Sequence, residues 1–281
     1  MKQKLPSTPG PIGVFDSGYG GLTILDKIRG LMPEYDYIYL GDSARCPYGP
    51  RSFEVVYEFT LQAVSKLFEL GCPLVILACN TASAKALRTI QQINLPVIDA
   101  TRRVLGVIRP TAECIGEITR SRHVGILATA GTIKSESYLL EIHKLSPDIV
   151  VTGEACPMWV SLVENNEYQS EGADYFVKQH INRLLDKDPM IDTIILGCTH
   201  YPLLLDKIRQ FTPGHIRIIA QGEYVARSLQ DYLNRHPEMD ARCEKGGKCR
   251  FLTTESENKF EESASIFLGR QDIKVESIAL E

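Results

Sequence analysis

The chain has 281 residues, enough for one large domain or two of ordinary size, and either arrangement buries a substantial hydrophobic core. Its 44% hydrophobic, 23% charged and 8% aromatic residues are typical of a globular enzyme and exclude disordered, collagenous and membrane chains. The net charge of −4 comes without any dense Lys/Arg cluster, which excludes the usual nucleic-acid binders. We therefore expect neither a nucleic-acid nor a membrane partner.

Residues 1–11 contain three prolines and no hydrophobic periodicity, which predicts a flexible tail. The same segment lacks the apolar stretch of a secretion signal, and no apolar run in the chain approaches the ~18 residues that span a bilayer. We therefore expect a cytoplasmic protein whose eight cysteines are reduced thiols.

From Ile12 onward, short apolar runs alternate with stretches whose apolar spacing is close to 3.6. The first three predicted strand and helix pairs cover residues 12–15 with 21–31, 37–40 with 52–70, and 74–78 with 81–93. Such alternation predicts βαβ units and a mostly parallel sheet.

After a predicted helical stretch near residues 103–120, the same alternation starts again. Predicted strands cover 124–128, 149–151 and 191–196, and the helices between them extend to about 145 and over 157–164 and 172–185. This repetition indicates an internal duplication of one α/β plan.

The last predicted elements are strands at 216–219 and 250–253 and helices at 224–235 and 258–268, which we expect to fold back onto the first half. Domain one is then discontinuous, with residues 12–101 plus 214–281, and domain two is the inserted segment 102–213. We expect two similar parallel-sheet α/β domains, related by a pseudo-twofold axis, with the functional site between them.

Two cysteines, Cys79 and Cys198, each follow a predicted strand and precede a helix. In parallel α/β sheets, ligands bind outside the carboxyl ends of the strands, and a helix start stabilises a thiolate. Most cysteines are small core hydrophobes, and we interpret the other six in that way. Cys79 and Cys198 differ because polar residues follow each of them, namely Asn80 and Thr81, and Thr199 and His200.

Three loops at other strand ends are further candidates. Asp16 and Ser17 precede Gly18, Gly20 and Gly21, a turn that suits a carboxylate or phosphate but lacks the spacing of a dinucleotide fingerprint. Tyr48, between Pro47 and Gly49, is poorly placed for a core residue and is predicted to line a small pocket. Thr129 and Thr132 supply hydroxyls in the second half, although Thr132 also suits a helix N-cap.

Metal binding and hydrolysis are the alternatives to weigh at these residues. Zinc needs three or four ligands, whereas Cys198 with His200, and Cys243 with Cys249, each offer two, so we predict no metal site. A Cys–His hydrolase accounts for Cys198 and His200 but leaves the second cysteine in a matching setting unexplained.

If the two halves face each other, Cys79 and Cys198 flank a substrate carbon from opposite sides. A thiolate on one face removes a proton while a thiol on the other face delivers one, which inverts the stereocentre without a cofactor. Asp16 and His200 are then the groups that tune the two sulfurs.

Six segments together give the chain a family resemblance: residues 16–21, 47–49, 79–83, 131–135, 155–164 and 197–202. On these motifs the chain resembles the aspartate/glutamate racemase family, from about Ile12 to Leu268. The resemblance implies a cofactor-free enzyme that interconverts L- and D-glutamate and supplies D-glutamate for peptidoglycan synthesis. We also expect a homodimer.

By this resemblance, Cys79 takes the proton from D-glutamate, assisted by Asp16, and Cys198 takes it from L-glutamate, assisted by His200. Glu164 matches a further acidic catalytic residue of the family near the second cysteine. The residues that the resemblance assigns to binding the substrate are Ser17, Pro47, Tyr48, Gly49, Asn80, Thr81, Thr129, Thr132 and Thr199. Ser161 and Gln221 depart from the family's usual proline and acidic residue. A racemase for another acidic amino acid such as aspartate, and an amino-acid-binding redox sensor, are the alternative functions.

Overall fold

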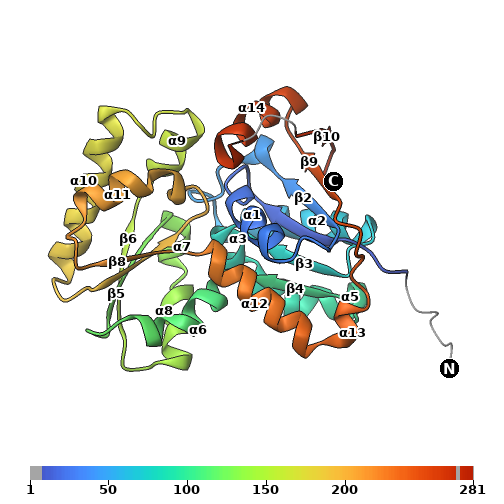
Figure 1. Ribbon diagram of the computed structural model, residues 1–281, viewed down its shortest axis with the longest axis horizontal. Coiled ribbons are helices and arrows are strands. Elements are labelled where there is room, and N and C mark those ends of the chain that lie inside the picture. The colour runs from blue at the N-terminus through green and yellow to red at the C-terminus, as the bar shows by residue number, and fades with distance from the viewer. Residues whose placement is uncertain (1–7, 270–272, 281) are drawn as a thin grey trace.

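Two parallel β-sheets, each covered by helices on both faces, lie side by side in the computed structural model (Figure 1). The structure describes residues 8–269 and 273–280. Within these residues the first sheet has the strand order β10-β9-β2-β1-β3-β4 and the second has the order β6-β5-β7-β8. All the pairings are parallel.

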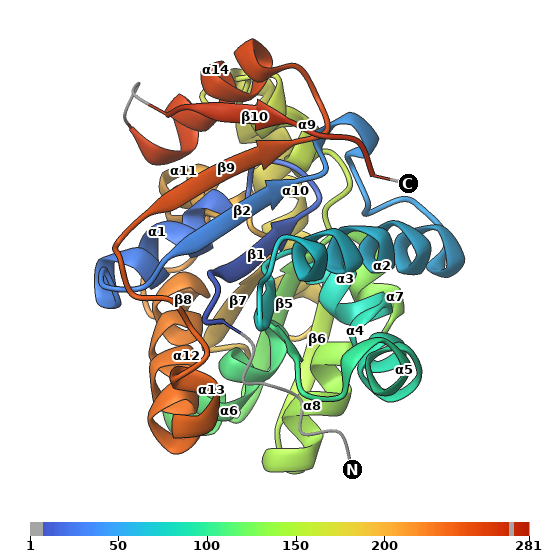
Figure 2. The same cartoon turned by 90° about the vertical axis from the view of Figure 1, so that its right-hand side faces the viewer.

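The first sheet is seen nearest the viewer in Figure 2, where β10, β9, β2 and β1 lie next to one another. Its strands are β1 (Ile12–Asp16), β2 (Tyr37–Gly41), β3 (Leu74–Leu77), β4 (Arg103–Gly106), β9 (Cys249–Thr253) and β10 (Val275–Ser277). Successive residues of a strand point to opposite faces, so Val14 packs on one side of the sheet and Phe15 on the other. Both faces are buried, which explains why these strands are continuous hydrophobic runs.

Helices of the first half form two layers around this sheet. One layer is α1 (Leu22–Leu31), α12 (Gly222–Arg235) and α14 (Glu257–Leu268), and the other includes α2 (Phe53–Glu69) and α3 (Asn80–Lys85). Shorter elements complete this half, namely η1 (Ser43–Arg45), α4 (Leu87–Thr89), η2 (Ile90–Asn94), α5 (Leu95–Asp99) and α13 (Pro237–Asp240).

The second sheet consists of β5 (His123–Ala128), β6 (Val150–Ala155), β7 (Thr193–Gly197) and β8 (Arg217–Ala220). One face is covered by α6 (Ile108–Ile118) and α8 (Ser137–Leu145), and the other by α9 (Trp159–Glu164), α10 (Glu171–Lys187), η3 (Tyr201–Leu204) and α11 (Leu205–Phe211). The short α7 (Ala130–Lys134) contacts α3 between the two halves (Figure 1).

Two strands lie in the sheet opposite to the one predicted. Residues 103–106, predicted to be helical and to belong to domain two, form β4 and pair with β3, because Val104 and Leu105 pack on the two faces of the first sheet. Residues 217–220, predicted in domain one, form β8 and pair with β7, because Ile218 and Ile219 pack on the two faces of the second sheet. The chain therefore crosses between the halves after β4 and again after β8.

Two other predictions about local structure need correction. The helix predicted over 81–93 is broken at Ala86, and a π-helical segment, η2, follows α4. Of the tail predicted over 1–11, residues 1–7 lie outside the described residues. Gly10 is not free: its N–H donates to Arg242 O at 3.0 Å, and Glu244 N donates to Gly10 O at 2.8 Å.

Candidate active site

The carboxyl ends of the central strands of both sheets carry the predicted site residues. Asp16 is the last residue of β1, and Cys79 follows two residues after β3. In the second half, Thr129 comes directly after β5 and Cys198 directly after β7. Because strands of a parallel sheet end at one edge, each half places its candidates together, as expected.

Cys79 is a buried thiol, with 5% of its surface exposed. Its Sγ donates to Ser17 Oγ at 3.4 Å and accepts from Ala82 N at 3.5 Å, so the sulfur caps the start of α3. Burial, together with the negative charge of Asp16, raises the pKa of Cys79 to about 12. At neutral pH this group is therefore a thiol, ready to deliver a proton.

Cys198 is 7% exposed and lies against an imidazole ring: its Sγ is 3.9 Å from His200 Nδ1. The other ring nitrogen, His200 Nε2, is 3.0 Å from Glu164 Oε1. Burial lowers the pKa of His200, but hydrogen bonds to Cys198 and Glu164 outweigh this effect and raise the pKa to about 10. The imidazole is consequently protonated at neutral pH and holds a positive charge beside Cys198.

The two thiols belong to one site. Thr199, the neighbour of Cys198, donates from Oγ1 to Asp16 Oδ1 in the other half at 3.3 Å. Cys79 in turn donates to Ser17, the neighbour of Asp16, at 3.4 Å. The turn after β1 therefore contacts the segments of both cysteines, and their joint action on one substrate stays a prediction.

Asp16 is fully buried, and its environment differs from the predicted pairing with one sulfur. Oδ2 accepts from Gly18 N at 3.0 Å, and burial raises the pKa of the carboxyl group. Its charge acts on Cys79, whereas its side-chain hydrogen bond goes to Thr199, and the charge of His200 lowers its pKa in turn. Asp16 therefore influences both sides of the site.

Gly20 allows the Asp16–Gly21 turn to approach the other half closely. A Cβ at this position would lie 2.5 Å from His200 Nδ1 and closer still to Thr199 Oγ1. Because such distances are far inside van der Waals contact, His200 or the turn would have to move.

We expect Gly20→Ala to lower kcat by about 10²-fold, since a displacement on the order of 1 Å in an active site has that effect. Gly30→Ala is the matched control: Gly30 lies in the same α1 region, and its Cβ would meet nothing within 4 Å. Steady-state kinetic assays of both variants, with circular dichroism to verify folding, test this expectation. Equal activities in the two variants would contradict it.

A cluster of threonine hydroxyls joins the two halves. Thr81 Oγ1 is 2.9 Å from Thr129 Oγ1 and 3.4 Å from Thr132 Oγ1, and the last two are 3.1 Å apart. Thr129, not Thr132, is the N-cap of α7. Nearby, Gly131 N donates to Gly49 O at 3.0 Å, which ties the 47–49 loop to the second half.

Tyr48 is a core residue, so the prediction that it is poorly placed for a core is wrong. It is 1% exposed, packs against Phe15 and Phe59, and donates its hydroxyl hydrogen to Asp42. Adjacent Pro47 accepts from Arg51 Nε through its carbonyl at 3.3 Å. The 47–49 loop therefore contributes to the site region mainly through backbone groups.

Asn80 belongs to a buried amide network that the sequence did not reveal. Its Nδ2 donates to Gln221 Oε1 at 2.7 Å, and its Oδ1 accepts from Tyr138 Oη at 2.7 Å. Gln221 Nε2 also donates to Val107 O at 3.1 Å. Tyr138 lies in a regular helical pattern, which gives no signal that its hydroxyl reaches across to the first half.

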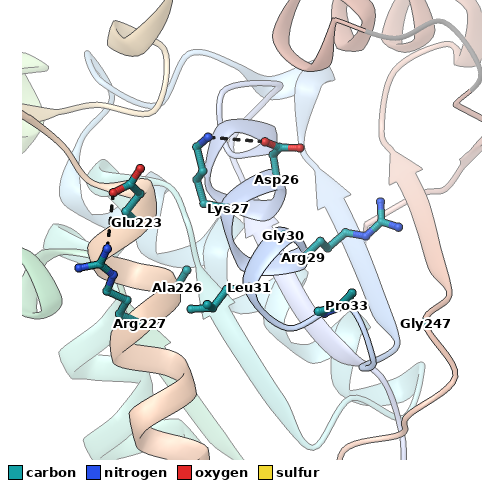
Figure 3. Close-up of a pocket in the computed structure, with 10 residues that line it drawn as sticks. All are labelled: Asp26, Lys27, Arg29, Gly30, Leu31, Pro33, Glu223, Ala226, Arg227 and Gly247. Atoms are coloured by element: carbon teal, nitrogen blue, oxygen red, sulfur yellow. Dashed lines mark ion pairs between the residues drawn. The ribbon is translucent and has the colours of Figure 1, made fainter.

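The two cysteines are almost fully buried beneath these contacts. A surface groove of about 590 Å³ lies elsewhere, between α1 and α12, lined by Lys27, Arg29, Leu31, Pro33 and Arg227 among others (Figure 3). No predicted site residue lines this groove. One of its walls is α1, and Gly20 and Gly21 come directly before that helix in the sequence.

No group of three or more His, Cys, Asp or Glu side chains that would hold a metal ion occurs among residues 8–269 and 273–280. The eight cysteines all lie among the described residues, and they form no disulfide there. In the part of the chain that the structure describes, no helix combines the length and apolar character needed to cross a membrane.

Comparison with known proteins adds to this geometry. A family profile described as Asp/Glu/Hydantoin racemase matches residues 23–229. A glutamate racemase of Ruegeria sp. (strain TM1040) is 38% identical over 270 residues, covering 92% of this chain and 97% of that protein.

Two solved structures are similar over nearly the whole chain. A glutamate racemase isoform of Bacillus anthracis has a TM-score of 0.87 and 36% identity, covering 96% of this chain and 98% of that one. A glutamate racemase of Francisella tularensis in complex with D-glutamate has a TM-score of 0.85 and 31% identity, covering 97% and 98%. These similarities confirm the predicted fold class of two parallel-sheet α/β halves.

Proposed function

Because the chain belongs to the Asp/Glu/hydantoin racemase family, we propose that it inverts the Cα centre of glutamate with Cys79 and Cys198 as its two acid–base groups. The chain is an isomerase that racemises glutamate. The observation that supports the role of the cysteines is a pair of buried thiols, one at the end of a central strand in each half, whose neighbouring residues are joined by the Thr199–Asp16 hydrogen bond. Neither aspartate racemisation nor a non-catalytic binding module is favoured by the relatives.

In the L-to-D direction, Cys198 acts as the base and removes the Cα proton, and Cys79 delivers its proton to the opposite face. Cys198 then carries the proton and Cys79 the negative charge, so D-glutamate meets the reverse arrangement. The positive charge of His200 stabilises Cys198 as a base, while the high pKa of Cys79 makes it a strong base once it has given up its proton.

The carboxylates of the substrate need hydrogen-bond donors other than the two thiols. The hydroxyls of Ser17, Thr81, Thr129, Thr132 and Thr199 are buried at the two strand-end edges and supply such donors when the halves separate. No arginine or lysine is required for this role, because backbone N–H groups and hydroxyls in a dry site bind carboxylates well.

We place this activity in the cytoplasm, where D-glutamate is used for peptidoglycan synthesis, and we propose a homodimer. An exposed apolar patch on η2 and α5 supports the dimer: Ile93, Val97 and Ile98 lie there, and Val97 is 85% exposed. Contiguous exposed aliphatic side chains of this kind are typical of protein–protein contacts.

The test uses L-glutamate in D₂O with no pyridoxal phosphate added. We expect the ellipticity of the substrate to decay to zero and the D-glutamate formed to carry deuterium at Cα, since the thiol that delivers the proton exchanges with solvent. L-Aspartate in the same assay should keep its ellipticity. Binding of glutamate without decay would favour the sensor alternative, and product without deuterium would exclude proton transfer by the thiols.

A further inference from the structure

Cys46 lies between the two halves, directly after η1, and its side chain points at the carboxylate that holds His200. Its Sγ donates to Glu164 Oε1 at 3.0 Å. We propose that Cys46 is a positioning residue of the active site, whose thiol holds Glu164 in place for His200. This inference rests on the proposed function, in which His200 supports Cys198 as a base.

The contact between Cys46 and Glu164 adds one more group to a row of interacting side chains that leads to Cys198. Glu164 Oε1 accepts from Cys46 at 3.0 Å and lies 3.0 Å from His200 Nε2, and His200 Nδ1 lies 3.9 Å from Cys198 Sγ. One carboxylate oxygen therefore receives both the thiol and the imidazole. The Glu164 side chain is 20% exposed, so water replaces only part of what the thiol provides.

The geometry also leaves little freedom around the thiol. Glu164 is the last residue of α9 in the second half, whereas Cys46 belongs to the first half, so the contact forms only when the halves are closed. A Cβ on Gly18 would lie 3.0 Å from Cys46 Sγ and 3.4 Å from Glu164 Oε1. The Asp16–Gly21 turn thus packs directly over this pair, and Cys46 is built into the site.

Several charged or titratable groups act on this pair from neighbouring elements. Those that act on Glu164 or Cys46 are His200, Lys259 on α14, Tyr19, Asp16 and Cys79. Burial raises the pKa of Glu164, but the hydrogen bond and charge of His200, with the Cys46 hydrogen bond, bring the pKa below its usual value. Burial and Glu164 together raise the pKa of Cys46 well above its usual value, so the thiol keeps its proton and remains a donor.

A substitution that removes the Cys46 thiol also removes a hydrogen bond to the Glu164 carboxylate, which should favour the protonated form of Glu164. In Cys46→Ala, we expect the acid limb of kcat with L-glutamate to move to higher pH by about one unit, since a hydrogen bond to a charged group contributes on that scale. Cys46→Ser keeps a donor and should keep the acid limb near its original position. Cys114→Ala is the matched control, because this half-buried thiol in α6 donates at 3.1 Å to Thr111 O of its own helix.

A reciprocal measurement needs no turnover and no truncated side chain. If Cys46 donates to Glu164, replacing the carboxylate by an amide should lower the pKa of the thiol and speed its alkylation. We expect iodoacetamide to label Cys46 several-fold faster in Glu164→Gln than in the parent protein, as followed by mass spectrometry of its peptide, with Cys114 labelled at an unchanged rate.

An acid limb in Cys46→Ala that coincides with that of the parent, or equal labelling of Cys46 with and without the Glu164 carboxylate, would overturn the inference. An equal shift in the alanine and serine variants would do the same. If the parent protein does not racemise glutamate, the proposed function fails, while the labelling experiment still decides whether the thiol and carboxylate are coupled.

Discussion

Cys79→Ala and Cys198→Ala each lose racemisation almost completely, with kcat expected to fall by about 10⁴-fold or more in both directions. Each variant lacks the acid or base on one face of the substrate, and inversion needs both faces in every turnover. The remaining thiol still meets one enantiomer. We therefore expect Cys79→Ala to exchange the Cα hydrogen of L-glutamate with D₂O slowly and without inversion, and Cys198→Ala to do so with D-glutamate.

Nuclear magnetic resonance of the recovered amino acid, together with its optical rotation, separates exchange from inversion. Cys72→Ala is the control, because this thiol is buried in the core of the same half as Cys79, away from the substrate side. It should destabilise the protein modestly and leave kcat unchanged. Near-normal racemisation by either site variant would show that two thiols are not required.

The next largest effects are expected at His200 and Asp16, and thermodynamics restricts how they appear. L- and D-glutamate have equal free energies, so kcat/KM must be the same in both directions for the parent and for every variant. A group that assists only one sulfur can therefore change kcat by different factors in the two directions, and KM then changes so that kcat/KM stays equal for L- and D-glutamate. We expect His200→Asn to lower kcat by about 10²-fold or more with L-glutamate and by less with D-glutamate, with KM compensating.

Asp16→Asn should show the opposite, weaker bias, because Asp16 acts on Cys79 by charge yet also binds Thr199 beside Cys198. Primary deuterium isotope effects with α-deuterated L- and D-glutamate report the same bias directly, since slowing one proton abstraction makes that step more limiting. Identical changes in kcat and in isotope effect for the two enantiomers of both variants would contradict the assignment of His200 to one sulfur.

The unequal effects on the two reaction directions follow from the charged groups near the two cysteines, because the backbone arrangement of the two halves is similar. The two halves share a parallel-sheet arrangement with a cysteine at a central strand end, but their surroundings differ: burial and a carboxylate raise the pKa of Cys79 to about 12, whereas a protonated imidazole lies against Cys198. In a reaction between mirror-image substrates, the resting enzyme is therefore asymmetric. A buried carboxylate acts by its charge on Cys79, whereas an imidazolium lies against Cys198.

The sequence predicted the parts of the fold whose signal is local. Cys79 and Cys198 stand out because buried apolar runs end there and polar side chains follow, and the predicted helix start at Ser52 coincides with an observed N-cap. Sheet membership of β4 and β8 was predicted wrongly, because a short strand of four residues carries no information on which neighbour it pairs with.

The sequence also could not predict which side chains contact each other across the interface between the two halves. Tyr48 was expected to line a pocket because proline and glycine flank it, yet its ring fills the core while its hydroxyl finds Asp42. Cys46 is predicted to be a core cysteine. No local pattern reveals its partner Glu164, because that residue lies more than a hundred residues away along the chain. Contacts of this kind depend on how the two halves are joined, which no local pattern encodes.

The two chain crossings, after β4 and after β8, lie next to each other, because Gln221 at the start of α12 donates to Val107 O at the start of α6. We expect the two halves to rotate about these adjacent crossings as about a hinge. Asn80 is bonded to Gln221 at these crossings. Glu164, the partner of Cys46, ends α9, and that helix lies on the opposite side of the molecule from α6 and α12 (Figure 1). We therefore expect a rotation of the halves about these crossings to separate Cys46 from Glu164 more than it separates Asn80 from Gln221.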